Sequence, residues 1–100
     1  MAQPVYKVWL AKYKDAWYKL SAAEQQKISA QVGAALKKVG GEEIVFCYSG
    51  WSSEAWPGFG VEKFPSIEAE MAHSQLLVEL NWFQYIESKT YLGTEFPQSG

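Results

Sequence analysis

The sequence has one cysteine, Cys47, and one histidine, His73, among its 100 residues. A single cysteine cannot form a disulfide within the chain, and this is typical of proteins from a reducing cytoplasm, where we expect the protein to reside. A single histidine excludes a metal site built from several histidines. Any chemistry that requires an imidazole must therefore use His73.

Long apolar runs and an excess of basic charge are also missing. No apolar stretch reaches the roughly eighteen residues that a membrane-spanning helix needs, and the first residues lack the pattern of a signal peptide. Lysine and arginine number 9 against 11 aspartates and glutamates, which gives a net charge of −2. Nucleic-acid-binding modules need a basic surface. The sequence therefore predicts no membrane segment and no nucleic-acid partner.

Aromatic residues are abundant, with five Trp, six Tyr and five Phe. Tyrosine and tryptophan are enriched in ligand pockets and at subunit interfaces. Four aromatics lie in the segment CYSGWSSEAWPGFG (47–60), where three glycines and a proline predict a loop. A loop with this many aromatics is expected to cover a pocket mouth or to contact a second subunit.

Residue patterns predict four strands and two helices. Alternating apolar positions and β-branched or aromatic residues predict strands at 4–13, 42–51, 59–64 and 82–94. The first helix is expected from the N-cap Ser21 to Val39, because Ser21 and Glu24 form a capping-box pair and Gly40 suits a left-handed C-cap. The second helix is expected from the N-cap Ser66 to Leu80, where Asn81 can end it.

The element order β-α-β-β-α-β predicts an α+β, ferredoxin-like fold. In this fold a four-stranded antiparallel sheet carries both helices on one face. We expect one domain, ordered over about 4–94. On the second helix, one apolar stripe is expected to face the sheet, and it comprises Ala69, Ala72, Leu76 and Leu80. A second stripe lies on nearly the opposite side, and it comprises Ile67, Met71 and Val78.

The sheet face without helices is predicted to be apolar as well. In the first strand, Trp9 and Ala11 alternate with Val8 and Leu10, so both faces carry apolar side chains. An exposed apolar face of this kind requires a partner. We therefore expect a homodimer in which two sheets pack face to face and enclose a cavity.

The segment FPSIEAEMAHSQLLVEL (64–80), the chain length and the element order resemble the dimeric α+β barrel superfamily. This superfamily includes the antibiotic-biosynthesis monooxygenase-like, EthD-like and stress-responsive barrel families and the haem-degrading monooxygenases. Its members commonly have an aromatic residue at the end of the third strand, then a Ser or Asp cap, then a helix with a histidine, which correspond here to Phe64, Ser66 and His73. The segments VYKVWLAKY, DAWYKLSAAE and NWFQYIESKTYLGT also resemble a small uncharacterised bacterial family of about 100 residues with this fold.

The resemblance implies a dimer with one pocket per subunit between the sheet and its helices. It does not specify the reaction, because this fold hosts oxygenases, cyclases, isomerases and dehalogenases. His73 occupies the helix position of the family histidine, which implies a general base or a haem ligand. The alternative is a partly buried histidine bonded to a backbone carbonyl or a carboxylate.

Further candidate site residues come from the predicted strands and the loop. In the fourth strand, Tyr85, Glu87, Lys89 and Tyr91 are expected on one face, with Glu87 as an acid or base and Tyr85 as a hydrogen-bond donor. The alternative for Glu87 and Lys89 is an ordinary cross-strand ion pair. Tyr48 is a further orienting or proton-relay candidate. Side chains expected to contact a substrate are Trp9, Trp51, Trp56 and Phe59.

These features together predict a small homodimeric enzyme without a tightly bound cofactor. Its substrate would be a hydrophobic, aromatic or polyketide-like molecule, and its reaction an oxygenation, cyclisation or isomerisation with His73 as base. One alternative is a dimer that binds a small molecule or serves as a structural unit without catalysis. A haem-binding or haem-degrading protein is a third possibility.

Overall fold

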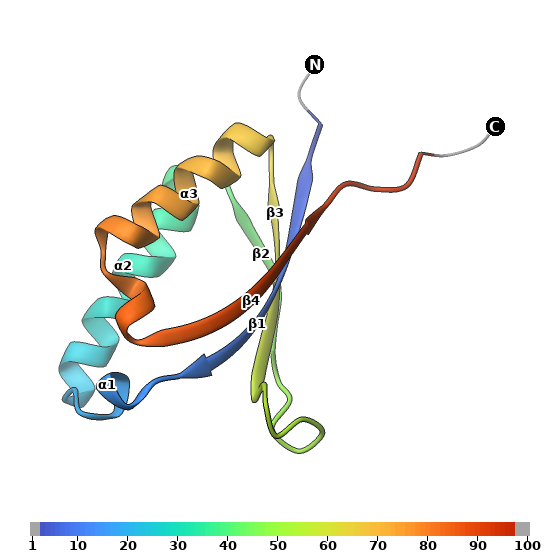
Figure 1. Cartoon of the computed structure of the whole chain (residues 1–100). Coiled ribbons are helices and arrows are strands. Elements are labelled where there is room, and N and C mark those ends of the chain that lie inside the picture. The colour runs from blue at the N-terminus through green and yellow to red at the C-terminus, as the bar shows by residue number, and fades with distance from the viewer. Residues whose placement is uncertain (1–2, 98–100) are drawn as a thin grey trace.

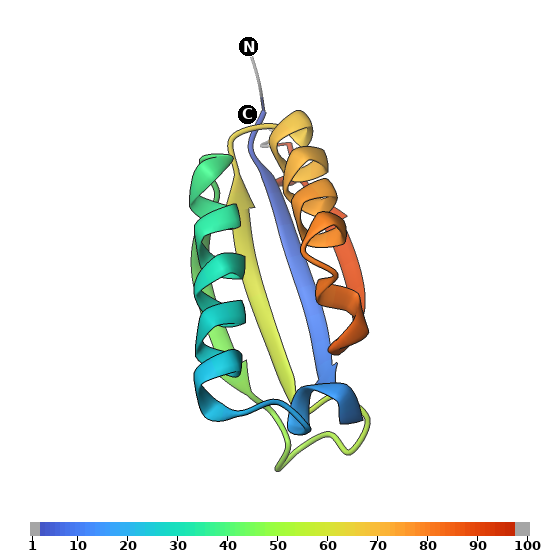
Figure 2. The same ribbon diagram turned by 90° about the vertical axis from the view of Figure 1, so that its left-hand side faces the viewer.

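The computed structural model describes residues 3–97, and its four strands form one antiparallel sheet in the order β2-β3-β1-β4 (Figure 1). The strands are β1 (Val5–Tyr13), β2 (Glu42–Tyr48), β3 (Gly58–Phe64) and β4 (Ile86–Gly93). Two long helices, α2 (Ala22–Lys38) and α3 (Ile67–Glu79), lie side by side over one face of the sheet (Figure 2). This arrangement confirms the predicted ferredoxin-like α+β fold.

Local capping signals set the ends of both helices as predicted. The hydroxyl of Ser21 accepts a hydrogen bond from the backbone N–H of Glu24, whose carboxylate accepts one from the Ser21 N–H, and both bonds measure 3.1 Å. The hydroxyl of Ser66 accepts from the backbone N–H of Ala69 at 3.2 Å. Gly40 and Asn81 adopt left-handed conformations, with φ of 78° and 56°. Short-range sequence patterns therefore fix these boundaries.

The structure adds one short helix and changes the bounds of two predicted strands. Residues 15–18 form a short helix, α1 (Asp15–Tyr18), and the fourth strand begins at Ile86 rather than 82, because η1 (Trp82–Gln84) is a 3-10 turn. The second strand ends at Tyr48 rather than 51. Aromatic packing accounts for the first two differences: the ring of Trp17 stacks on that of Tyr13 at 4.7 Å and meets the edge of Trp82 at 5.8 Å. An extended chain at 82–85 would move the Trp82 ring away from this cluster.

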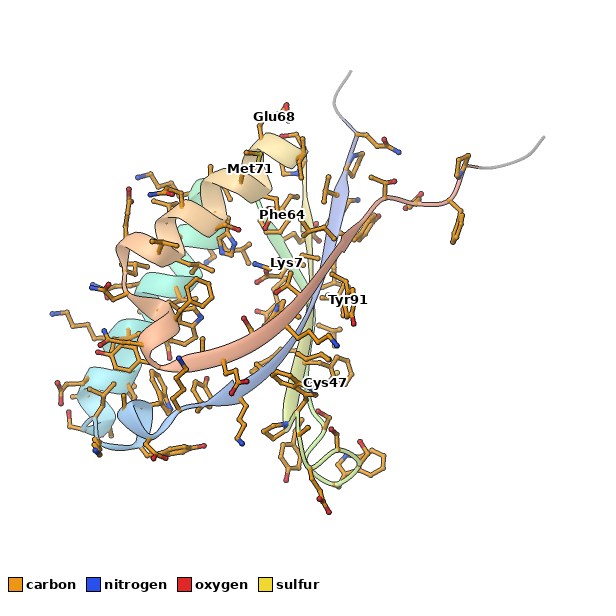
Figure 3. All side chains as sticks on the ribbon, viewed as in Figure 1. Lys7, Cys47, Phe64, Glu68, Met71 and Tyr91 are labelled. Carbon is orange, nitrogen blue, oxygen red and sulfur yellow. The ribbon has the colours of Figure 1, made fainter. Side chains whose placement is uncertain are left out.

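The strand register assigns each side chain to one of two faces. Lys7 pairs with Glu62 and Trp9 pairs with Gly60, so these residues share the face beneath the helices. The opposite face carries a row of paired residues across all four strands: Val45, Val61, Val8 and Tyr91. Figure 3 shows Lys7 and Phe64 on the helix side and Tyr91 on the other. Within residues 3–97, no other element covers this second face (Figure 1).

Candidate functional site

A cavity of about 290 Å³ lies between α3 and the sheet. Its walls come from β1, β3, β4, α3 and η1, so segments from most of the chain meet there. The apolar side chains of the wall are Trp9, Leu77, Trp82, Phe83, Ile86 and Leu92. The ionisable side chains are Lys7, Glu62, Glu70 and His73. A mostly apolar pocket with a few convergent polar groups is the usual form of a small-molecule site.

Trp9 forms part of the cavity wall because Gly60 has no side chain. A Cβ atom at position 60 would lie 2.5 Å from Cε2 and Cζ2 of the Trp9 ring, too close for any other residue. The indole also stacks on the ring of Phe46, with 5.1 Å between centroids and an interplanar angle of 27°. Its Nε1 is buried and has no hydrogen-bond partner. The glycine therefore allows a large aromatic ring to lie across β3 with its N–H donor free.

Lys7 and Glu70 form an ion pair between the sheet and α3. The distance from Lys7 Nζ to Glu70 Oε2 is 3.9 Å, and both side chains are buried. Glu70 Oε2 also accepts a hydrogen bond from the hydroxyl of Ser74, one turn later on the helix, at 2.8 Å. Removing charged groups from water costs several kcal/mol each, so a buried pair of this kind is a weak source of stability.

His73 projects from α3 into the same cavity and is only 2% exposed. Its ring lies 5.3 Å from the ring of Phe64, and its Nδ1 has no hydrogen-bond partner. Burial, aided by the positive charge of Lys7, lowers the pKa of His73 from 6.5 to about 4. The imidazole is therefore neutral at pH 7, with one ring nitrogen free to accept a proton.

Glu62 faces the helices from β3 and is also buried. Its Oε1 has no hydrogen-bond partner. Burial raises the pKa of this carboxyl, and the charges of Glu43 and Glu70 raise it further, while Lys7 opposes the shift. Glu62 thus retains its proton to a higher pH than an ordinary glutamate does.

Across residues 3–97, three buried side-chain polar atoms have no hydrogen-bond partner, and all three belong to residues of this one cavity. They are Trp9 Nε1, Glu62 Oε1 and His73 Nδ1. Folded proteins pair nearly all buried polar groups, because an unpaired one costs about 1–3 kcal/mol. Unpaired groups that converge on a cavity are typical of a site whose hydrogen bonds are completed by a ligand.

The structure places the other predicted site residues outside this cavity. Tyr48 lines a second cavity of about 420 Å³ beside Tyr13 and Phe46, which shares Ile86 with the first. Tyr85 precedes β4 and packs its ring edge against Trp17 at 6.1 Å. By the strand register, Glu87 and Phe59 point to the face without helices. Of the site residues predicted from the sequence, His73 and Trp9 both line the cavity between α3 and the sheet.

The loop between β2 and β3 bends toward the sheet face without helices (Figure 1). Serines hold its shape: the Ser49 hydroxyl donates to the Trp56 carbonyl at 2.7 Å, and the Ser53 hydroxyl accepts from the Trp56 N–H at 3.1 Å. Trp51 is 82% exposed. Neither Trp51 nor Trp56 lines either cavity.

The buried side of α3 differs from the apolar stripe expected from the sequence. Its buried residues are Glu70, His73 and Leu77, whereas Ala72 is exposed. The prediction was wrong because it assumed an apolar inward face, while this helix turns the polar side chains of Glu70 and His73 toward the cavity. Lys7, Glu62 and Glu70 were missed as site residues for the same reason. One available signal was the alternation of β1, which places Lys7 on the same face as Val5 and Trp9.

Residues 3–97 contain neither a cluster of metal ligands nor a helix that could cross a membrane. No three His, Cys, Asp or Glu side chains within residues 3–97 lie close enough together to hold a metal ion. None of the helices in this range has both the length and the apolar composition needed to cross a membrane.

No protein-family model matches the chain, and no curated protein matches it either. Among solved structures, the chain is similar to a protein of unknown function from Rhodopseudomonas palustris, with a TM-score of 0.61 and 14% sequence identity over 98% of this chain and 86% of that one. A hypothetical Arabidopsis thaliana protein matches with a TM-score of 0.49 and 17% identity, over 98% and 91% of the two chains. The similarity to the bacterial protein supports the fold alone.

Proposed function

We propose that the chain is a small homodimeric enzyme that removes a proton from an aromatic small molecule bound between α3 and the sheet, with His73 as the base. The observation that carries this proposal is the buried imidazole of His73, which lines a largely apolar cavity and whose Nδ1 has no hydrogen-bond partner. Cofactor-independent oxygenation, cyclisation and isomerisation can all begin with an enolate or enol formed by such a proton transfer. The proposal thus covers the three reactions expected from the sequence.

The surroundings of His73 suit this role in two ways. Burial keeps the imidazole unprotonated at neutral pH, so it can accept a proton as soon as the ligand binds, and its pKa of about 4 also makes it a weak base that needs help from a second group. The rings of Trp9 and Trp82 and the side chain of Leu77 supply an apolar wall for an aromatic ligand. A ligand there would be partly shielded from water, which strengthens its electrostatic interactions with the wall.

Deuterium exchange tests the proposed base without knowledge of the natural substrate. Phenylacetone in D2O has methylene protons beside a carbonyl, and their loss is followed by proton NMR. We expect the protein to accelerate this exchange and His73→Gln to lower the rate by about 100-fold, because general base catalysis contributes 10²–10⁴-fold. Met71→Gln introduces the same side chain on the outer side of α3, where Met71 is 62% exposed, and should leave the rate unchanged.

The base proposal fails if the protein neither binds phenylacetone nor accelerates exchange, or if His73→Gln exchanges at the wild-type rate. Binding with no exchange would favour the alternative of a non-catalytic small-molecule-binding protein.

The proposed dimer uses the sheet face that carries no helix. Val8, Val45 and Tyr91 lie in one row on this face, and they are 37%, 41% and 56% exposed. Contiguous apolar patches of this kind mark interaction sites on soluble proteins. The loop with Trp51 bends toward the same face and would extend the contact. This mode of assembly agrees with the resemblance to dimeric α+β barrels, and the unpaired Cys47 agrees with a cytoplasmic location.

Light scattering at micromolar concentration tests the dimer. The expected mass is 22.6 kDa, twice the chain mass of 11.3 kDa. Val8→Glu places a charge in the centre of the apolar row and should give a monomer, since an unpaired buried charge at an interface is strongly unfavourable. Val78→Glu makes the same change on α3, where Val78 is 55% exposed, and should remain dimeric. A monomeric mass for the unmodified protein would refute the dimer.

A further inference from the structure

The cavity contains a second ionisable group suited to proton transfer, on the wall opposite His73. Glu62 extends from β3 in the sheet, whereas His73 extends from α3 above it. Glu62 is 9% exposed and His73 is 2% exposed. The carboxyl oxygen Oε1 of Glu62 and the ring nitrogen Nδ1 of His73 both lack a hydrogen-bond partner. A ligand that fills the space between them can contact both groups.

Trp9 adds a hydrogen-bond donor next to Glu62. Trp9 pairs with Gly60 and Lys7 pairs with Glu62, so Trp9 and Glu62 are diagonal neighbours on the same sheet face. Diagonal neighbours lie roughly 7–8 Å apart, close enough for two long side chains to converge on one ligand atom. The indole N–H only donates hydrogen bonds, so the ligand atom it contacts must be an acceptor.

The low basicity of His73 requires a partner of this kind. A base with a pKa of about 4 takes a proton from carbon only if the negative charge left on the ligand is neutralised at the same time. Lys7 is already paired with Glu70, which leaves the carboxyl of Glu62 as the available acid in the cavity.

We propose that Glu62 is the general acid that acts with His73, and that the ligand is an uncharged aryl ketone or a similar carbonyl compound whose oxygen accepts hydrogen bonds from Trp9 and Glu62. This inference rests on the proposed function of His73 and specifies the substrate class. In the reaction, a C–H bond next to the carbonyl breaks and its proton passes to His73 Nδ1. The electron pair forms the C=C bond of an enol, and the carbonyl oxygen takes the proton of Glu62.

The charges balance in this step. A neutral ketone becomes a neutral enol, while His73 becomes an imidazolium and Glu62 becomes a carboxylate. Lys7, the cross-strand partner of Glu62, then stabilises the new carboxylate, and this carboxylate is the counter-charge of the imidazolium. Return of the proton to the same or another carbon regenerates both groups, so no oxidant, reductant or cofactor is needed.

The same charges select an uncharged ligand. Four ionisable groups line the cavity. Two of them, Glu62 and Glu70, are carboxylic acids, and Lys7 is the one cation, which is already paired with Glu70. A carboxylate ligand would bring a further negative charge into a buried space that has no free cation. Phenylacetate has nearly the shape of phenylacetone, and we expect it to bind at least about tenfold more weakly at pH 7, because an uncompensated buried charge is costly.

Glu62→Gln tests the acid directly in the phenylacetone exchange assay. Glutamine has the same shape and a hydrogen-bond donor but cannot give up a proton, so phenylacetone should bind as before while exchange slows by about 100-fold. Glu43→Gln is the matched control: Glu43 is the cross-strand neighbour of Glu62 on β2, is exposed and does not line the cavity. Its rate should stay close to that of the wild type on the low-pH plateau, where Glu62 is protonated in both proteins.

The pH profile gives a second readout that a purely structural role would not change. Wild-type exchange should fall as pH rises through the Glu62 pKa, while the Glu62→Gln rate should be flat over that range. The charged groups facing Glu62 are Lys7 on β1, Glu43 on β2 and Glu70 on α3. Glu43→Gln removes a negative neighbour and should move the fall in rate to lower pH.

The outcomes separate this inference from the function proposed for His73. If Glu62→Gln exchanges at the wild-type rate while His73→Gln does not, Glu62 is not the acid and the base proposal stands. If phenylacetate binds as tightly as phenylacetone, the uncharged substrate class is wrong. If neither variant alters exchange, both proposals are overturned. Each variant is first compared with the wild type by circular dichroism, so that an unfolded protein is not mistaken for a catalytic defect.

Discussion

Replacing Phe64 by alanine is expected to lower the free energy of unfolding by about 3–5 kcal/mol, the usual effect of removing a fully buried aromatic ring. Phe64 is 0% exposed and is the largest fully buried side chain within residues 3–97. It ends β3 opposite Val5 and packs against the ring of His73. Urea denaturation measures the change. Stability of small domains is about 5–15 kcal/mol, so the loss is a large share of the total.

Phe96 provides the matched control because it is 95% exposed. Phe96→Ala deletes the same atoms where they are in contact with water, and it should change the free energy of unfolding by no more than about 0.5 kcal/mol. Equal effects of the two substitutions would show that Phe64 is not a core residue. Phe64→Ala also removes part of the apolar wall around His73, so the pKa of the remaining His73 should move back toward 6.5.

The second large effect is a loss of stability in acid that depends on His73. Its pKa is about 4 in the folded chain and 6.5 as the ordinary value, so the unfolded chain binds a proton more readily than the folded one below pH 6.5. Stability due to this group is therefore complete above pH 6.5, declines as pH falls and levels off below about 4. The total loss is about 3 kcal/mol, from the pKa difference between the two states.

His73→Gln isolates this contribution because glutamine does not titrate. The free energy of unfolding of the wild type minus that of the variant, measured in urea at pH 7, 5.5 and 4, should fall by about 3 kcal/mol over this range. Subtraction is needed because Glu62 acts in the opposite direction: its raised pKa makes the folded state more stable as Glu62 becomes protonated. A difference that stays constant between pH 7 and 4 would refute the burial of an unpartnered imidazole.

The sequence predicted the fold well where local interactions decide it. The pairing of Ser21 with Glu24 and the left-handed residues Gly40 and Asn81 act within a few positions of the chain, so their patterns are visible without a structure. The strand order follows from the β-α-β-β-α-β sequence of elements and the handedness of their connections. Its errors at Trp17 and Trp82 arise from contacts between aromatic rings far apart in sequence.

The site was predicted only in part, because its polar members break the rules that locate a core. Apolar periodicity selects Ala69 and Ala72 for the inward side of α3, whereas the structure buries Glu70 and His73. Glu62 looks like a solvent-exposed strand residue until the register places it opposite Lys7 under the helices. Gly60 shows its role only when the Trp9 ring is seen to cross it. Each of these depends on long-range packing, which one sequence does not contain.

The most direct test of a ligand site around a neutral His73 is a nitrogen NMR titration of protein labelled with ¹⁵N-histidine. The chain has one histidine, so the imidazole gives a single pair of nitrogen signals without assignment. We predict that the free protein titrates at a pKa of about 4 and that phenylacetone at pH 7 shifts the Nδ1 signal. A pKa near 6.5 together with no response to phenylacetone would contradict the site.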